Sequence, residues 1–161
     1  TQVGNTIRGE DHYANFGLGV SLDGDFITAS APFSDTTVGV DAGYARVYQL
    51  VGGTWTQVGQ QLEGKGPGTN VGAGSQTMSL NGKRVAYGAP YEASNTGLVR
   101  LFELQFGAWV QVGGDIEGVK TFDYVGWSVS VSGSRVAVGV PRNEYYLGNH
   151  FAGLVRVYEL T

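Results

Sequence analysis

This sequence has six long variable segments, at residues 10–15, 33–42, 65–74, 91–96, 119–124 and 142–152, and aromatic and acidic side chains gather in all of them except 65–74. An aromatic ring can stack on the apolar face of a sugar while neighbouring carboxylates and amides bind its hydroxyl groups. The same mixture suits a protein-binding hot spot, where tyrosine and arginine are enriched. The side chains that we expect to bind a ligand are His12, Tyr13, Phe33, Tyr91, Phe122, Tyr124, Tyr145, Tyr146 and His150.

Sequence signatures of other chemistries are missing. The chain has no cysteine, which removes thiol nucleophiles and cysteine-based metal sites. Neither a G-x-S-x-G nor an H-E-x-x-H motif occurs, and the two histidines, His12 and His150, are not at ligand spacing. The loop acids Asp35, Asp41, Asp123 and Glu144 could form a glycosidase pair, but isolated loop acids are usually solvated. We therefore expect no catalytic residue, no metal, no cofactor and no enzymatic activity.

Composition restricts the class of protein further. The 161 residues include 27 glycines, nine tyrosines and three tryptophans, and the net charge is -4. Such a composition favours short strands and tight turns. No apolar run has the roughly 20 residues of a membrane-spanning helix. The acidic balance, without clusters of basic residues, argues against a nucleic-acid partner.

The sequence repeats itself three times. The segments "TQVGNTIRG", "TQVGQQLEG" and "VQVGGDIEG" start at Thr1, Thr56 and Val110. Each is followed by a copy of "SLDGDFITASAP" and then by a copy of "GYARVYQL". We assign one repeat domain to residues 1–161, with repeats at about 16–63, 71–117 and 125–161, and with residues 1–9 completing the last.

Each repeat predicts four extended segments in an antiparallel sheet. Asp23-Gly24, Asn81-Gly82 and Ser132-Gly133 predict tight hairpins between the first two segments, because both turn positions need a positive φ. A proline then ends the second segment, since it lacks the N–H that a sheet needs. Alternating strands should place these hairpins at one face and the six long segments at the opposite face. Function is usually found on loops that a rigid scaffold holds.

Two recurring residue types favour structural roles. Trp55 and Trp109 hold the same repeat position, where we expect packing between repeats. Arg46, Arg100 and Arg156 also recur, each followed three residues later by Gln49, Glu103 or Glu159. We expect these residues to form cross-strand pairs.

The two ends of the chain are complementary. The last repeat stops at "GLVRVYELT" without the tryptophan-led segment, and the chain opens with the "TQVG" that follows it elsewhere. The N-terminal segment can therefore supply the missing strand to its own last repeat. Alternatively, it can complete the last sheet of a neighbouring chain.

Phe16-Gly17 and Gly88-Ala89-Pro90 resemble the FG-GAP repeat, the blade unit of integrin α-subunit β-propellers and of many microbial surface proteins. The other copies are degenerate: Val125-Gly126 stands for FG, and "SAP" and "GVP" stand for GAP. The resemblance covers essentially the whole chain and implies four-stranded blades around an axis and extracellular recognition. The tight turns "DGD", "NGK" and "SGS" stand where the family commonly has a calcium loop, and they cannot supply its six to eight oxygen ligands.

These observations predict an all-β fold of three four-stranded antiparallel repeats, arranged as propeller-like blades. A propeller usually has about four to eight blades, so three imply a homo-oligomer or a larger repeat array. A threefold β-prism or β-trefoil is the alternative. We expect an extracellular or cell-surface recognition and adhesion module that binds a protein or glycan, the alternatives being a lectin and a structural assembly unit.

Overall fold

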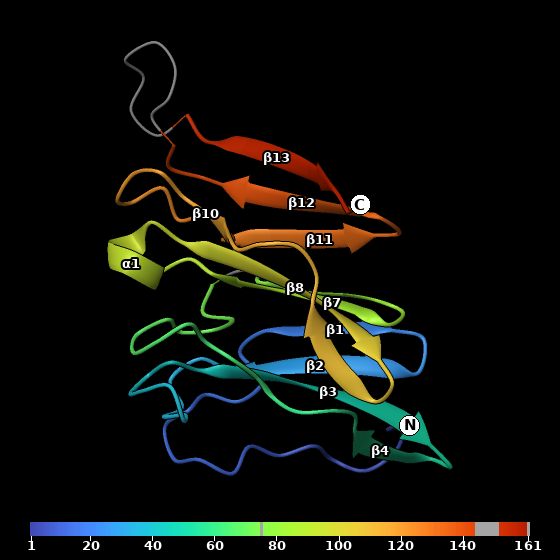
Figure 1. Cartoon of the computed structure of the whole chain (residues 1–161). Helices are drawn as coiled ribbons and strands as arrows, with labels where there is room; N and C mark the ends of the chain where they lie inside the picture. The colour runs from blue at the N-terminus through green and yellow to red at the C-terminus, as the bar shows by residue number, and fades with distance from the viewer. Residues whose placement is uncertain (75, 144–151, 161) are drawn as a thin grey trace.

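The computed structural model describes residues 1–74, 76–143 and 152–160 and shows an all-β protein (Figure 1). Its strands form three antiparallel sheets, none of which closes on itself. One short helical element, α1 (Glu92–Asn95), departs from an expectation of strands alone; φ is positive at Ala93 and Ser94 within it. Among the described residues, no helix is long and apolar enough to cross a membrane.

The first sheet is a meander built from the first repeat. Its strands are β1 (Val20–Asp23), β2 (Phe26–Ala31), β3 (Tyr44–Val51) and β4 (Thr54–Gln57), and β5 (Leu62–Glu63) also pairs with β3. Asp23 pairs with Phe26, so Gly24 lies in a tight turn, and its φ of 54° is one that glycine adopts without steric cost. The predicted hairpin therefore forms at its predicted place.

The second and third sheets follow the same order of strands. The second contains β6 (Met78–Asn81), β7 (Arg84–Ala89), β8 (Leu98–Gln105), β9 (Ala108–Gln111) and β10 (Ile116–Glu117). The third contains β11 (Ser128–Ser132), β12 (Arg135–Val140) and β13 (Leu154–Glu159). The sheets thus have five, five and three strands in the described residues, where four in each were predicted.

The three sheets stack face on face, and apolar side chains fill the two spaces between them. Met78 and Leu80 of the second sheet pack in one core cluster with Ala45 and Val47 of the first. A second cluster joins the opposite face of the second sheet to the third; it contains Ala86, Val99, Leu101, Val125, Val129, Val131, Val136, Val138 and Val140. The order of the sheets in space therefore follows their order along the chain.

A tryptophan ties each five-stranded sheet to the segment that precedes its repeat. The Trp109 indole N–H donates to the Val58 carbonyl (2.8 Å), and its backbone N–H donates to the Gln60 side chain (3.0 Å). Trp55 makes the corresponding bonds to Val3 (3.0 Å) and Asn5 (2.7 Å). Within this chain, the N-terminal segment therefore lies against the first sheet and not against the last; its pairing with a neighbouring chain stays a prediction.

Cross-strand ion pairs form at Glu103 and Glu159, but their partners are not the recurring arginines. Glu103 pairs with Arg84 (3.0 Å), its neighbour across the β7–β8 ladder, and Glu159 pairs in the same way with Arg135 (2.8 Å). Arg100 instead donates two hydrogen bonds (2.8 and 3.0 Å) to the carboxylate of Asp115, just before β10. Arg100 and Glu103 have different partners because side chains alternate along a strand, so that residues three apart face opposite sides of the sheet.

The Arg100–Asp115 pair makes the free energy of unfolding depend on pH in the acid range. The bonds from Arg100 lower the pKa of Asp115 below its ordinary value of 3.8. The carboxylate therefore stabilises the fold above about pH 4, and this contribution is lost as pH falls through the lowered pKa. We expect Asp115→Asn to reduce the free energy of unfolding by about 2 kcal/mol at pH 7, since bonds to charged groups are worth about 1.5–3 kcal/mol.

Urea denaturation at neutral pH and at pH values below the ordinary pKa tests this expectation. The difference between Asp115→Asn and the parent should shrink in acid. Glu159→Gln is a matched control, because the Arg135–Glu159 pair is more exposed, with side chains 71% and 51% accessible. A pH-independent loss in Asp115→Asn would contradict the assigned role of the carboxylate.

Candidate functional site

The long segments gather at one edge of the stack, and the tight hairpins gather at the opposite edge, as Figure 1 shows. This arrangement follows from the antiparallel meander, in which alternate connections return to the same edge. We call the edge with residues 10–15, 32–43, 64–74, 90–97, 118–124 and 141–143 the loop face. Function is sought here because these connections vary in length and side chains while the sheets hold their ends.

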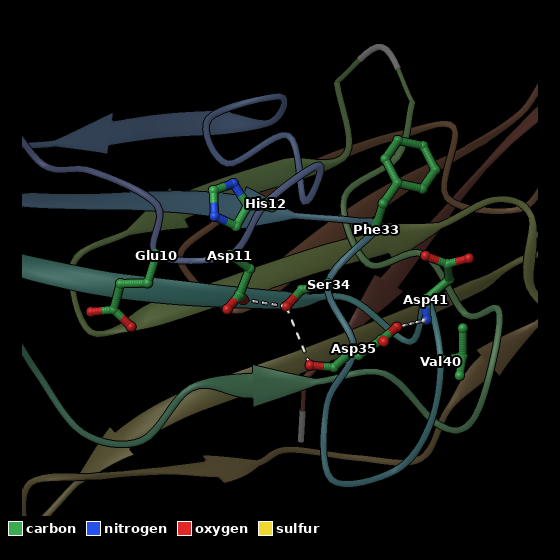
Figure 2. A pocket seen from close by; sticks show the side chains of 8 residues that line it. All are labelled: Glu10, Asp11, His12, Phe33, Ser34, Asp35, Val40 and Asp41. Atoms are coloured by element: carbon green, nitrogen blue, oxygen red, sulfur yellow. Dashed lines mark hydrogen bonds between the residues drawn. The ribbon is translucent and has the colours of Figure 1, made fainter.

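An open hollow of about 520 Å³ lies on the loop face beside the first sheet (Figure 2). Two segments form it: the chain before β1 and the connection from β2 to β3. Its lining residues are Glu10, Asp11, His12, Phe33, Ser34, Asp35, Val40 and Asp41. The structure thus brings together His12 and Phe33, two of the predicted ligand-binding residues, which lie 21 positions apart in the sequence.

Hydrogen bonds hold the walls of this hollow. The buried Ser34 hydroxyl donates to the Asp11 carboxylate (2.5 Å) and thereby joins the two segments. The Asp41 backbone N–H donates to the Asp35 carboxylate (3.0 Å), which closes the loop between them. Two of the four acidic side chains therefore have structural partners inside the hollow.

The hollow is acidic, but its charge is partly balanced. Arg46 reaches Glu10 (3.2 Å) from β3, and its guanidinium lies over the Tyr44 ring, 4.5 Å from the centroid. Burial raises the pKa of the Tyr44 phenol, so this group stays neutral. Within the described part of the chain, no group of three or more histidine or acidic side chains is arranged to hold a metal ion.

A second feature of the loop face is an aromatic cluster at the boundary between the second and third sheets. The Tyr91, Tyr124 and Trp127 rings meet edge to face, with centroids 5.7–6.2 Å apart. Phe122 adds a tilted contact to Tyr124 at 6.3 Å, and the Arg142 guanidinium lies 5.0 Å from the Tyr124 centroid. Three predicted binding residues, Tyr91, Phe122 and Tyr124, thus share one cluster.

Part of the predicted site lies elsewhere. Tyr145, Tyr146 and His150 fall outside the described residues. Tyr13 neighbours His12, with ring centroids 6.5 Å apart, and is 93% exposed. Sequence reasoning missed Ser34 and Arg142; Ser34 gave no signal of its own, because its role depends on a carboxylate 23 residues away.

Two exposed aromatic residues of the loop face, Tyr13 and Phe122, are held on a left-handed backbone. The residue three positions before each of the pairs Phe16-Gly17, Val71-Gly72 and Val125-Gly126 has a positive φ: 63° at Tyr13, 71° at Gly68 and 68° at Phe122. Glycine, as at Gly68, adopts this conformation freely, whereas another residue costs roughly 1–2 kcal/mol. An aromatic side chain that is exposed and on a costly backbone contributes little to stability, and such strain is often found at functional positions.

Tyr13→Gly is therefore expected to leave the fold intact and to be about 1 kcal/mol more stable than Tyr13→Ala, which keeps the left-handed backbone and also loses the ring. Urea denaturation followed by far-UV circular dichroism gives the difference. A Tyr13→Gly variant less stable than Tyr13→Ala would show that left-handed backbone strain does not set the stability at this position.

Comparison with known proteins gives one further finding. No family model matches the sequence. A stretch of the chain is 35% identical over 71 residues to an octanoyl-[GcvH]:protein N-octanoyltransferase of Macrococcus caseolyticus (strain JCSC5402). The match takes in 44% of this chain and 26% of that enzyme, so the chain corresponds to about a quarter of its relative's length.

This similarity contradicts the expectation that the chain has no enzymatic activity, because the protein it resembles is an enzyme. The expectation rested on missing motifs, such as G-x-S-x-G and H-E-x-x-H, that belong to particular enzyme families. Motifs of that kind do not transfer between families. Their absence from one sequence was therefore too narrow a basis for excluding catalysis.

Proposed function

We propose that this chain is a recognition module that binds a protein or glycan ligand through its loop face. The observation that carries the proposal is the pair of exposed aromatic residues on a left-handed backbone, Tyr13 and Phe122, which are 93% and 54% exposed. Tyr13 stands beside the hollow, and Phe122 stands at the edge of the aromatic cluster. These two places are the proposed contact points.

The hollow has the chemistry of a site for a hydroxyl-rich ligand. The Phe33 side chain is 40% exposed and offers an apolar surface for stacking. Carboxylates such as Asp35 and Asp41 around it are strong hydrogen-bond acceptors. A sugar presents both complements, an apolar face and a ring of hydroxyl donors, so a lectin-like activity is the most specific form of the proposal.

The proposal includes the architecture and the location of the protein. The face-to-face stacking of meander sheets supports propeller-like blades of the FG-GAP type better than a β-prism or β-trefoil. Proteins with such repeats work outside the cell or at its surface, where we also place this chain. A protein ligand would use the same loop face, with the Tyr91, Phe122 and Tyr124 rings as its apolar contact.

An array of glycans and extracellular proteins tests the proposal, with the chain labelled at its N-terminus. We expect a hit that Tyr13→Gly or Phe33→Ala weakens at least about tenfold, a loss of roughly 1.4 kcal/mol in binding. Phe106→Gly is the matched control. Phe106 is also exposed and also has a positive φ, of 50°, but it lies in a hairpin at the opposite edge.

Two results would reject the recognition function. One is an array without any hit. The other is a hit that Phe106→Gly removes as strongly as the loop-face variants do, because the ligand would then lie at the opposite edge of the stack.

The similarity to the octanoyltransferase favours a second candidate, acyl transfer to a protein. Its test is direct: the chain is mixed with octanoyl-[GcvH] and an acceptor protein, and mass spectrometry follows the octanoyl group. Accumulation of octanoylated acceptor above a blank without the chain supports the candidate. An unchanged acceptor in the presence of equimolar chain rejects it.

A further inference from the structure

The stack of sheets ends in two apolar faces that the described residues leave open. At the first sheet, Val20 and Leu22 of β1 are 60% and 64% exposed. At the third sheet, Val155 and Val157 of β13 are 71% and 63% exposed. We call these surfaces the β1 face and the β13 face.

Inside the protein, the counterparts of these residues are buried against each other. Val20 and Leu22 hold the repeat positions of Met78, Leu80, Val129 and Val131, which are 7% exposed or less. Val155 and Val157 hold the positions of Ala45, Val47, Val99 and Leu101, which are 3% exposed or less. Each internal interface therefore joins one surface of the β1-face type to one surface of the β13-face type.

Each internal interface also contains the same backbone-to-serine hydrogen bond. The Leu80 backbone N–H donates to the Ser21 hydroxyl (3.0 Å), and the Val131 N–H donates in the same way to Ser79 (2.9 Å). The next hydroxyl in this series is Ser130, on the β13 face, and the next N–H is that of Leu22, on the β1 face.

The glycines that hold one position of each repeat also indicate that the β1 face is open. A Cβ on Gly72 would meet Ser30 of the first sheet at 2.3 Å, and one on Gly126 would meet Gly88 of the second at 3.0 Å. Gly17 is their counterpart, yet a Cβ there would have nothing within 4 Å. Gly17 is thus a glycine at a position where its counterparts contact the preceding sheet, but no described residue contacts it there.

The N-terminal segment fits the same series. The Val58 N–H donates to the Val47 carbonyl, and the Val112 N–H donates to the Leu101 carbonyl, both at 2.9 Å. Val3 is the counterpart of Val58, and Val157 is the counterpart of Val47. A preceding sheet on the β1 face would therefore place its Val157 carbonyl beside the Val3 N–H.

We propose that the β13 face of one copy of this chain docks on the β1 face of a second copy, head to tail. The interface repeats the two internal ones: Val155 and Val157 pack on Val20 and Leu22, and Ser130 accepts from the Leu22 N–H. The contact is heterologous, because the two faces differ, so it either closes into a ring or continues as a chain of copies.

Light scattering on the purified 161-residue chain, over a dilution series, tests this proposal. The expected mass is at least twice the 17.0 kDa of one copy at the upper end of the series. Leu22→Glu and Val157→Glu should each weaken association at least about tenfold, because each buries a charge without a partner. Val119→Glu is the control, since Val119 is 81% exposed but lies on the loop face.

Mixing the two variants gives the decisive result. Leu22→Glu keeps an intact β13 face and Val157→Glu keeps an intact β1 face, so the mixture should form dimers that neither variant forms alone. Far-UV circular dichroism shows that each variant is folded. A monomer at every concentration would overturn the proposal, and so would association that only one of the two substitutions affects, because that pattern belongs to a symmetric contact.

Discussion

Replacing Trp109 with alanine is expected to lower the free energy of unfolding by about 4 kcal/mol, in the range of buried tryptophan-to-alanine changes. Trp109 is 3% exposed and packs in the core between the first two sheets. Its indole N–H also donates to the Val58 carbonyl, so the substitution removes apolar contacts and leaves a partly buried acceptor without its donor. Urea denaturation followed by far-UV circular dichroism measures the loss.

Two further variants separate the parts of this effect. Trp109→Phe keeps most of the apolar contact and should lose about 1 kcal/mol, the net value of the missing hydrogen bond. Trp55→Ala is the repeat-matched control; Trp55 is only partly buried and contacts the exposed N-terminal segment, so about 2 kcal/mol is expected. Equal losses at Trp55 and Trp109 would contradict the assignment of Trp109 to the core.

Gly88→Ala is expected to destabilise the protein by about 3 kcal/mol, at the upper end of the cost of overpacking a core. A Cβ at this position would lie 2.0 Å from the Gly126 carbonyl oxygen, which belongs to the backbone just before β11 of the third sheet and cannot rotate away as a side chain could. The second and third sheets would have to separate locally. Thermal unfolding together with urea denaturation records the change.

Gly114→Ala is the control for this substitution. A Cβ on Gly114 would have nothing within 4 Å, and neither Gly88 nor Gly114 has a positive φ, so the two changes differ in contact alone. The control should stay within about 0.5 kcal/mol of the parent protein. If Gly88→Ala were equally mild, the close contact between the sheets would not limit their packing.

The general location of the candidate site could be predicted from the sequence. Which of its residues lie close to one another could not. The alternation of tight hairpins and long connections was enough to put the aromatic and acidic segments at one edge. The sequence could not show that His12 and Phe33 share a hollow, while Tyr91 and Tyr124 belong to a separate cluster. Those groupings arise from contacts between different connections, such as the bond from Ser34 to Asp11.

The ion pairs were also only partly predictable from the sequence. Arg46, Arg100 and Arg156 were recognisable as a series from their spacing. The partners of Arg46 and Arg100 were not, because Glu10 comes before the repeat that contains Arg46, whereas Asp115 comes after the strand that contains Arg100. The pairing of strands within a sheet, and not the spacing along one strand, decides which acid Arg84, Arg100 or Arg135 reaches.

Features that depend on a few neighbouring residues could be predicted from the sequence alone: the strands, the Asp23-Gly24 type of turn and the separation of the two edges. These follow from local backbone preferences, which are the same in an isolated segment and in the folded protein. The packing of distant segments sets which sheet the N-terminal segment contacts, which side chains line the hollow and which faces the described residues leave open. Such features depend on contacts between segments some 50 residues apart in sequence, and they exist only once the sheets have stacked.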